Sequence, residues 1–581
     1  MSRRRAVLLA SGLLLLVVLV LGALVGWRAL QVNDSLQQAV RDAEATRTAL
    51  ESGDQAAIDA ALTSLQSSSR DAAEQTDGAI WSLATALPVI GDDASGVRTA
   101  ARVVSDLANT GIAPLAEQAT QLDQILPADG SVDLDAVRDL QAPVRQAAEA
   151  LTEARADLAA EDSSGFVDRF KTEYRELVTI VGDAAGAMDS AAVGVDLLPE
   201  LLGAEGRREY LLVFQNNAEI RATGGLPGAM SIVSADDGAV ALGRQDSAAR
   251  FGERAEPVLP LTEDEVDIYS EKLGTFMLDA NFTPDWPRAA ELIRARWEEV
   301  HPEELAGVLT VDTVAVSYLL GATGPVEVGP YTLTEENAVD VLLSQVYADI
   351  TNPAEQDAFF RTVASTVFDR VAGGDVGNPR DLLRALVRAG DEGRVYVNLT
   401  DEVEQAEIAA RRVAGASEDG EGAASLVDVS LLDGTGSKMS YYLDYDVKAR
   451  STSCTDGTAR LALQMRLEST PPADPTTLPR YVTGGVNVST EPGEQLVQVR
   501  MATPSGGSVS GFTIRGKDFD PDEDAMLGDR QVSTVYLLLE PGKPADITWE
   551  VEVPQAAASV PVRVTPGLRP EDYSGTVSTA C

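Results

Sequence analysis

The segment YLLVFQNNAEIRATGGLPG, from Tyr210 to Gly228, marks the point where the sequence changes character. Before it, small apolar residues recur at helical spacing, and after it short apolar runs alternate with helical segments. YLLVF is typical of a buried strand, and the polar residues and Gly-Gly pair behind it predict a tight connection to a second strand. The following residues predict a hairpin that turns at Asp237-Gly238.

Strands and helices alternate from there to about residue 412, so we expect an α/β domain with a mixed sheet over residues 205–412. GVLTVD (307–312) predicts one of its strands, with Asp312 capping the helix that follows. The acidic run LTEDEVDIYSEK (261–272) is interpreted as a solvated flap. His301, in WEEVHPEEL, is interpreted as part of an exposed helix end.

The region before this domain, residues 30–204, is rich in Ala, Leu, Gln, Asp and Arg and shows almost no strand signal. Segments such as DSLQQAVRDAEATRTALES (34–52) carry small apolar residues three and four positions apart. The pattern predicts four or five antiparallel helices that form an extracellular bundle or stalk. Such a region suits a spacer or a docking surface better than a catalytic site.

The first 29 residues predict a membrane anchor. Three arginines in MSRRR precede an uncharged run over residues 6–27, which would form a helix roughly 33 Å long, enough to span a bilayer. The arginines favour a cytoplasmic N-terminus, with the bulk of the chain outside a cell membrane that it crosses once. The alternative is a cleaved signal peptide, whose apolar core usually runs for only about 7–15 residues.

The C-terminal part has a period of two. Residues 413–427 have the composition of a linker, and residues 428–581 predict a β-sandwich of immunoglobulin-like kind. In ARLALQMRLE (459–468) and ITWEVEV (547–553), apolar residues alternate with polar ones. Cys454 and Cys581 are the two cysteines of the chain, and in an exported domain they predict one disulfide.

The composition excludes several functions. A net charge of −45 argues against binding nucleic acid. The single histidine has no nucleophile near it in sequence, which argues against a Ser-His-Asp triad, a Cys-His pair or a histidine metal site. No cofactor is expected, apart from Mg²⁺ if the protein is an enzyme.

Four motifs in order, FQNNAEIRATGG, LDANFTPDWPRAA, LTVDTVAVSYLLGATGPVEV and LTEENAVDVLLSQVY, resemble the bacterial family called domain of unknown function 4012. With the anchor and the helical region, the resemblance covers nearly the whole chain. It implies a membrane-anchored envelope protein, of a kind often associated with surface-polysaccharide gene clusters.

The segment from Gly307 to Asp349 also resembles, more faintly, part of the LytR-CpsA-Psr phosphotransferases. That resemblance implies transfer of glycans linked to lipid pyrophosphate, which needs several arginines and an acidic residue around Mg²⁺. The sequence departs from that pattern, since Ser344 and Gln345 stand where those enzymes have an Arg-x-Arg pair.

The loop after YLLVF supplies the first ligand-binding candidates. Arg221 could present its guanidinium to a phosphate or carboxylate, and the Gly-Gly pair could let backbone N–H groups approach the ligand. Alternatively, the loop only connects two strands, with Glu219 pairing with Arg221. The full set of ligand candidates is Asn217, Glu219, Arg221, Gly224, Gly225, Arg288 and Arg361.

Asp279 and Asp285, in DANFTPDWP, offer oxygen ligands suited to Mg²⁺ or Ca²⁺, or alternatively cap a helix. The anchor, the modular exterior, the lack of a complete catalytic set in the sequence and the family resemblance together favour a non-catalytic envelope protein that binds, or helps to assemble, surface polysaccharide or a lipid-linked glycan. A divergent LytR-CpsA-Psr-like phosphotransferase or pyrophosphatase is the second hypothesis. A structural scaffold that docks partner proteins is the third.

Overall fold

The computed structural model describes residues 3–88, 90–118, 131–374, 378–417, 425–484, 488–569, 575–579 and 581, with side chains from Leu24 onward except at positions 51 and 379. The chain forms two compact units: Met1–Leu126 with Asp133–Glu200, and Pro127–Val132 with Leu201–Cys581. We call them the helical unit and the mixed unit and describe each by itself.

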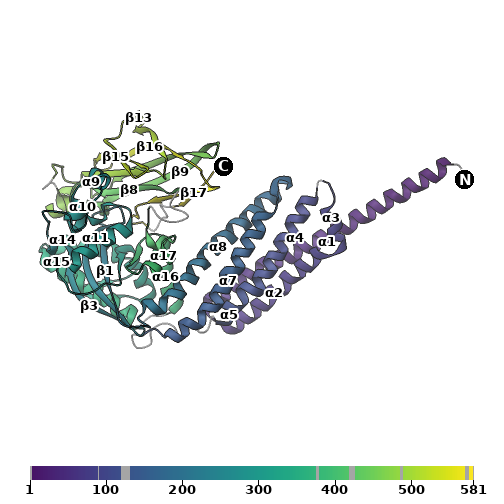
Figure 1. Ribbon diagram of the computed structural model, residues 1–581, viewed down its shortest axis with the longest axis horizontal. Helices are drawn as coiled ribbons and strands as arrows, with labels where there is room; N and C mark the ends of the chain where they lie inside the picture. Colours follow the sequence, from purple (N-terminus) through teal and green to yellow (C-terminus); the bar gives the residue numbers. More distant parts are fainter. Residues whose placement is uncertain are drawn as a thin grey trace. The chain divides into compact units, whose positions relative to one another are not determined.

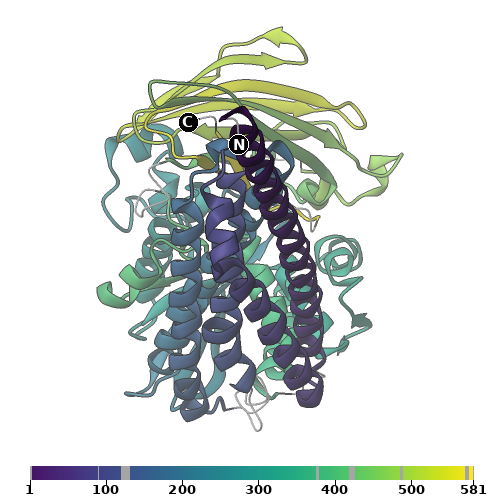
Figure 2. The ribbon, with the colours of Figure 1, turned by 90° about the vertical axis from the view of Figure 1, so that its right-hand side faces the viewer.

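The helical unit is built from helices that lie side by side, several of them long (Figures 1 and 2). They are α1 (Arg3–Ser52), α2 (Gln55–Asp77), α3 (Ala79–Thr85), α4 (Gly91–Asp106), a π-helical turn (Leu107–Ile112), α5 (Ala113–Gln118), α7 (Leu134–Ala160) and α8 (Asp168–Leu201). Asp54 and Asp133 cap α2 and α7 by accepting bonds from backbone N–H groups. Small core clusters, such as Ala100, Val103, Leu158 and Tyr174, join neighbouring helices. The predicted helical region is confirmed.

The predicted anchor over residues 6–27 lies within α1, but the side chains of residues 6–23 are outside the described part. Of the described helices, α8 is the one that is long and apolar enough to cross a membrane. In the structure α8 packs in the bundle, through residues such as Tyr174 and Val181.

The mixed unit begins with a five-stranded sheet in the order β3-β2-β1-β4-β7. The strands are β1 (Arg208–Asn216), β2 (Leu226–Asp236), β3 (Ala239–Ser247), β4 (Gly307–Asp312) and β7 (Val395–Leu399). β1 and β4 are parallel and the other pairs are antiparallel, so the predicted mixed sheet is confirmed. The predicted turn between β2 and β3 is also confirmed, with Asp237 and Gly238 both at positive φ.

One face of this sheet is covered by a densely packed layer. Leu211, Val213 and Val308 contact α11 (Trp286–Glu298), whose Trp286 and Trp297 are fully buried. The layer is completed by the short elements η3 (Ala248–Phe251), α9 (Glu263–Tyr269), α10 (Lys272–Thr275) and η4 (Met277–Phe282).

Two expectations about this layer are wrong. The acidic run includes α9, whose Ile268 and Tyr269 enter the core, while Glu265 is buried because it caps the helix and pairs with Arg288. His301 follows α11 but is not exposed: its side chain is 11% exposed and its ring packs on Trp297.

The opposite face of the sheet is covered by helices that follow β4 in the chain. They are α12 (Thr313–Thr323), α13 (Ala338–Asp340), a π-helical turn (Val341–Gln345), α14 (Val346–Asp349), α15 (Pro353–Ala372) and α16 (Pro379–Asp391). The hairpin of β5 (Val326–Val328) and β6 (Tyr331–Leu333) separates α12 from α13, and α17 (Glu402–Ile408) follows β7.

The C-terminal strands form two sheets that share one core. The first has the order β13-β12-β16-β10-β9 and the second β14-β15-β11-β8-β17-β18. The strands are β8 (Val427–Asp433), β9 (Leu443–Thr455), β10 (Thr458–Ser469), β11 (Gln495–Ala502), β12 (Ser508–Ile514), β13 (Lys517–Asp518), β14 (Glu523–Leu527), β15 (Arg530–Leu539), β16 (Ala545–Val553), β17 (Ser559–Val564) and β18 (Gly575–Ser578).

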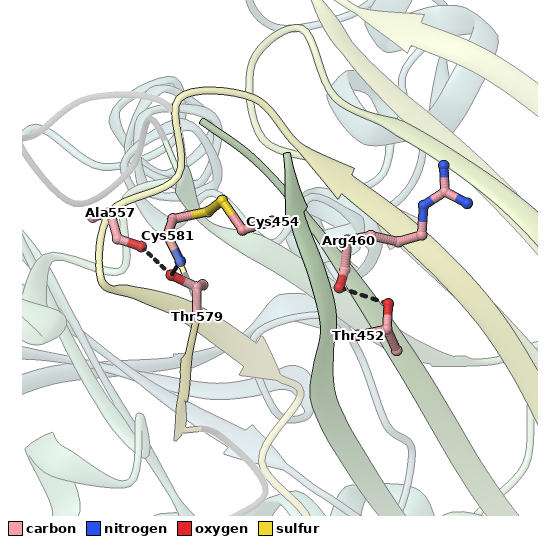
Figure 3. Close-up of a disulfide and its surroundings, with 6 residues drawn as sticks. All are labelled: Thr452, Cys454, Arg460, Ala557, Thr579 and Cys581. Atoms are coloured by element: carbon pink, nitrogen blue, oxygen red, sulfur yellow. Dashed lines mark hydrogen bonds between the residues drawn. A yellow bond between two sulfur atoms is a disulfide. The ribbon is translucent and has the colours of Figure 1, made fainter. Parts of the chain in front are cut away.

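The predicted apolar faces of β10 and β16 lie in that core, with Leu461, Met465 and Trp549 among its buried members. The predicted disulfide joins Cys454, at the end of β9, to Cys581 (Figure 3). The immunoglobulin-like topology stays a prediction. So does the linker over 413–427, of which residues 418–424 lie outside the described part.

Candidate functional site

The loop after β1 is held by the side chain of Gln215. Its Oε1 accepts bonds from the backbone N–H of Gly225 (2.8 Å) and from Thr223 Oγ1 (3.1 Å). Its Nε2 donates to Thr310 Oγ1 in β4, also at 2.8 Å. Asn281 Nδ2 donates to the carbonyl of Gly225 from the other side. The amide groups of this motif therefore fix the loop to the sheet.

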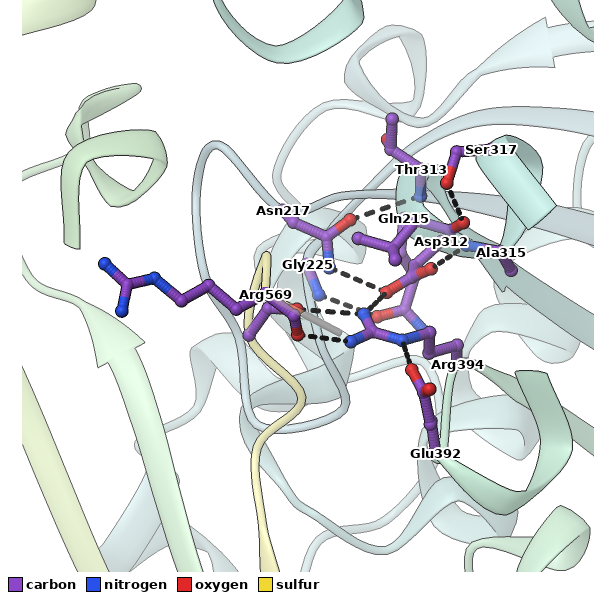
Figure 4. Close-up of polar contacts among 12 residues, drawn as sticks. Gln215, Asn217, Gly225, Asp312, Thr313, Ala315, Ser317, Glu392, Arg394 and Arg569 are labelled. Carbon is purple, nitrogen blue, oxygen red and sulfur yellow. Dashed lines mark hydrogen bonds and ion pairs between the residues drawn. The ribbon is translucent and has the colours of Figure 1, made fainter. Parts of the chain in front are cut away.

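Asn217 belongs to the same structural network (Figure 4). Its Nδ2 donates to Asp312 Oδ2 at 3.0 Å, and its Oδ1 accepts from the N–H of Thr313. Asp312 caps α12, as predicted, by accepting a bond from the N–H of Ala315 at 2.7 Å. The second Asp312 oxygen also accepts from Arg394, so Asn217 helps to orient a helix cap in the buried interior.

Gly224 and Gly225 are required by the path of the loop. Gly224 has φ of 129°, a conformation that side chains disfavour. A Cβ on Gly225 would lie 2.4 Å from the carbonyl carbon of Asn216, so the backbone at Asn216 leaves no room for a side chain at position 225.

Arg221 and Glu219 form a buried charge cluster beside this loop. Arg221 Nη2 lies 2.8 Å from Glu219 Oε1 and 3.4 Å from Asp279 Oδ1. The second Glu219 oxygen accepts a bond from Lys438 Nζ at 2.6 Å, and Lys438 comes from the segment between β8 and β9. The predicted pairing of Glu219 with Arg221 is therefore present, with Lys438 as a further partner.

The pKa of Glu219 reflects these cations. Burial favours the neutral acid, but attraction to Lys438 and Arg221 outweighs burial and lowers the pKa to about 2. Burial raises the pKa of Asp279, against the opposing attraction of Arg221. Glu219 is therefore ionised at neutral pH and holds both cations.

The other acidic and basic candidates do not join this cluster. Asp285 caps α11 and accepts a bond from the N–H of Ser417 at 2.7 Å. Arg288 pairs with Glu265 and Glu291. Among the described residues, no group of three or more His, Cys, Asp or Glu side chains is placed to hold a metal ion.

The mixed unit contains a cavity of about 490 Å³ between the sheet and the helices that follow β4. Its floor is the sheet face opposite α11. Two rows of apolar side chains cross β1, β4 and β7 in register: Leu212, Leu309 and Val397 in one row, and Phe214, Val311 and Val395 in the next.

The roof of the cavity is also apolar. It includes Val316 and Leu319 of α12, Leu342 and Leu343 of the π-helical turn, Phe360, Ala364, Val367, Phe368 and Val371 of α15, and Leu386 of α16. Protein interiors rarely contain voids much larger than a water molecule. A cavity of this volume is in the range of small-molecule sites, about 300–1,000 Å³.

Most polar side chains of the lining come from a few segments. They lie where β1 ends, along β3, in the N-terminal half of α15 and in the segments after β8 and β10, and they include Asn216, Glu219, Asp246, Asp357, Arg361, Lys438 and Tyr481. The lining residues from β7 and α16, namely Val395, Val397 and Leu386, are aliphatic, whereas β4 and the start of α12 add Thr310, Asp312 and Thr313. We call the part of the lining that contains Arg361 and Lys438 the polar end.

Arg361 and Glu219 are the predicted ligand residues that line this cavity. In the part of the chain that the structure describes, the Arg361 guanidinium has no carboxylate partner. Lys438 and Tyr481 were missed by the sequence analysis because they lie more than 200 positions from β1 and carry no local signal. The run YLLVF places apolar residues on both faces of β1, which indicates that both faces are buried. It does not reveal that a cavity lies over one of them.

An α/β domain with an apolar cavity against one sheet face thus defines the central part of this chain. Residues 205–347 match the sequence profile of the family described as "Protein of unknown function (DUF4012)", and this segment belongs to that family. It runs from β1 to α14 and contains four of the six floor residues. No curated protein and no solved structure matched the chain, and no comparison supported the fainter resemblance to LytR-CpsA-Psr phosphotransferases.

Proposed function

We propose that the mixed unit binds the hydrocarbon chain of a lipid that carries an anionic head group, and that this lipid is a carrier of envelope glycan. The observation that supports the proposal is the cavity, with two rows of aliphatic and aromatic side chains on its floor and apolar helices as its roof. An apolar cavity stays dry, and filling it with hydrocarbon is favourable because the lining side chains then make van der Waals contacts that they otherwise lack.

The polar end supports an anionic head group. Arg361 is a lining cation without a carboxylate partner among the described residues, and a guanidinium can donate two parallel bonds to a phosphate. Lys438 also lines this end, but Glu219 neutralises its charge, so Arg361 is the cation that would bind the head group. Phosphate or pyrophosphate on a polyprenyl chain has this combination of apolar chain and anionic head.

A binding role is favoured over catalysis. Arg221 and Arg288, two of the arginines that a phosphotransferase could use, are held by carboxylates at 2.8 and 2.7 Å. Phosphoryl transfer depends on several cationic groups placed around the reacting phosphate. Because Arg221 and Arg288 are already paired with carboxylates, Arg361 would contact the phosphate without them. A single arginine suits binding of a head group better than catalysis of phosphoryl transfer.

The location we propose is the outer face of a cell membrane, with residues 6–27 as the anchor and the N-terminus in the cytoplasm. The uncharged run and the arginines before it support this orientation. The Cys454–Cys581 disulfide fits an exported domain, since disulfides persist in oxidising compartments.

The proposal can be tested with a photoreactive prenyl phosphate that carries a diazirine on its chain, added to the full chain in detergent. We expect crosslinks in β1, β4 and α15. Ala364→Trp should abolish them, because Ala364 lines the cavity and the indole would fill it. Ala358→Trp, on the same helix but exposed and outside the lining, is the matched control and should be labelled normally. Equal labelling of both variants would contradict the proposal.

A further inference from the structure

Helix α16 (Pro379–Asp391) has apolar residues on two faces. Leu382, Ala385 and Ala389 are buried against the rest of the mixed unit. Leu383, Leu386 and Val387 are instead 51%, 46% and 54% exposed. A surface helix of a soluble domain normally presents charged and polar residues outward. The outer face of α16 therefore forms an apolar patch, which we define as Leu383, Leu386 and Val387.

Arginines flank this patch. The side chains of Arg384 and Arg388 are 54% and 44% exposed, and the helix carries three arginines against two aspartates in a chain whose net charge is −45. Arg384 pairs with Asp381, and Arg388 pairs with Glu392 at 2.8 Å and lies over the ring of Tyr318. Helices with leucines on one face and arginines beside it lie in the interface of anionic bilayers, where the long arginine stems extend toward the head groups.

The patch is continuous with the cavity. Leu386 is exposed on the outer face of α16, and it also belongs to the cavity lining, together with Leu319 of α12 and Val395 and Val397 of β7. The lining residues contributed by β7 and α16 are aliphatic. A hydrocarbon chain longer than the cavity would leave the protein at Leu386, and its emerging part would need an apolar surrounding.

We infer that the outer face of α16 contacts the surface of an anionic lipid bilayer, and that a bound chain passes between cavity and bilayer at Leu386. This inference rests on the proposed lipid ligand and adds the route by which the lipid chain passes between the bilayer and the cavity. The patch supplies the apolar contact, the excess of one arginine over the aspartates of α16 favours anionic head groups, and the shared Leu386 connects the contact to the binding site.

The contact can be measured with single cysteines, because both native cysteines are bonded to each other and an added one would be the only free thiol. Val387→Cys in the full chain is labelled with an environment-sensitive fluorophore and placed in nanodiscs that contain phosphatidylglycerol. We expect a blue-shifted emission and strong quenching by lipids that carry a nitroxide. Replacing phosphatidylglycerol with phosphatidylcholine should weaken both effects.

Val403→Cys is the matched control. Val403 is 73% exposed on α17 and is preceded by the exposed Asp401 and Glu402, so it is an apolar surface residue beside acidic side chains. Its label should remain in water. If the label at position 387 is quenched no more than the label at position 403, the inference is wrong. A label at position 387 that is shielded equally without lipid would indicate a protein contact and would also overturn it.

A second variant separates this inference from the proposed function. In Leu383→Asp/Val387→Asp, photoreactive prenyl phosphate delivered in detergent should still label the cavity, because neither residue lines it. Delivery from phosphatidylglycerol vesicles should fall at least tenfold relative to the unmodified chain. If the unmodified chain is not labelled by either route, the proposed function fails. If the variant is labelled equally by both routes, only the role of α16 fails.

Discussion

Arg394 and Asp312 form an ion pair in the interior of the mixed unit, with Nη1 3.0 Å from Oδ2 and both side chains 1% exposed. Asp312 ends β4 and caps α12, while Arg394 directly precedes β7. The same guanidinium donates to the backbone carbonyls of Gly567 and Arg569, in the chain that follows β17 (Figure 4). One side chain therefore ties the five-stranded sheet to the end of the C-terminal sheets.

We expect Arg394→Met to lower the free energy of unfolding by about 3–5 kcal/mol, because it leaves Asp312 as a buried carboxylate without its cation. Urea unfolding followed by tryptophan fluorescence would measure the loss. Arg460→Gln is the control, since Arg460 pairs with Glu550 and Glu552 at an exposed site and its removal should cost no more than about 1 kcal/mol. Equal midpoints for the two variants would argue against a structural role for Arg394.

Gly225→Ala should destabilise the loop after β1. The added methyl would lie 2.4 Å from Asn216, so the backbone must move and the bond from Gly225 N–H to Gln215 would be lost. A loss of roughly 2–4 kcal/mol is expected from overpacking together with the broken bond. In Gly228→Ala, three positions on, the methyl would meet the nearest atom at 3.6 Å, so this control should unfold close to the unmodified chain.

The stability of the charge cluster should depend on acid pH through Glu219. Its pKa is about 2 in the folded protein and 4.5 in the absence of the fold, so the folded state favours the ionised form. That contribution is fully present above pH 4.5 and is lost as the pH falls from about 4.5 toward 2. Unfolding free energies at several pH values should therefore show a steeper acid loss in the unmodified chain than in Glu219→Gln. Parallel curves would exclude a lowered pKa.

Arg361→Gln should change head-group selectivity. If Arg361 binds a phosphate, its loss should weaken binding of a prenyl phosphate by roughly tenfold or more, because a charged hydrogen bond contributes about 1.5–3 kcal/mol. Binding of the corresponding uncharged prenol should not change, which fluorescence titration in detergent can test. Arg244→Gln, on β3 and paired with Glu303, is the control and should bind both ligands normally. Equal loss for both ligands in Arg361→Gln would indicate damage to the cavity instead.

The Cys454–Cys581 disulfide closes a loop with a sequence separation of 127 residues (Figure 3). In the chain-entropy account, removing so long a cross-link costs about 4–5 kcal/mol. Cys454→Ser/Cys581→Ser should therefore lower the melting temperature, and reductant should shift the unmodified chain by a similar amount while leaving the double variant unchanged. A reductant effect on the double variant would point to a cause other than this bond.

Several features of the mixed unit could be predicted because neighbouring residues carry them. The turn at Asp237-Gly238 needs two residues that tolerate positive φ, and the cap at Asp312 needs a short acceptor before a helix. The buried face of β10 follows from strict alternation of apolar and polar residues. The errors, His301 and the acidic run at 261–272, arose where polar residues are buried by groups distant in sequence, the ring of Phe251 for His301 and the guanidinium of Arg288 for Glu265.

The order of elements, the mixed sheet, the apolar core of the C-terminal strands and the pairing of the two cysteines follow from the amino-acid sequence. Helix and strand propensities and apolar alternation act between neighbouring residues, and two cysteines allow one pairing. Which polar side chains stabilise the fold and which line a cavity depends instead on how distant segments pack. The side chains of Gln215, Asn217 and Arg221 bond to other groups of the protein, whereas Arg361 lines the cavity. The cavity exists because helices distant in sequence pack over the strands without filling one sheet face. Lys438 reaches that cavity from the segment between β8 and β9. No local sequence pattern encodes either arrangement.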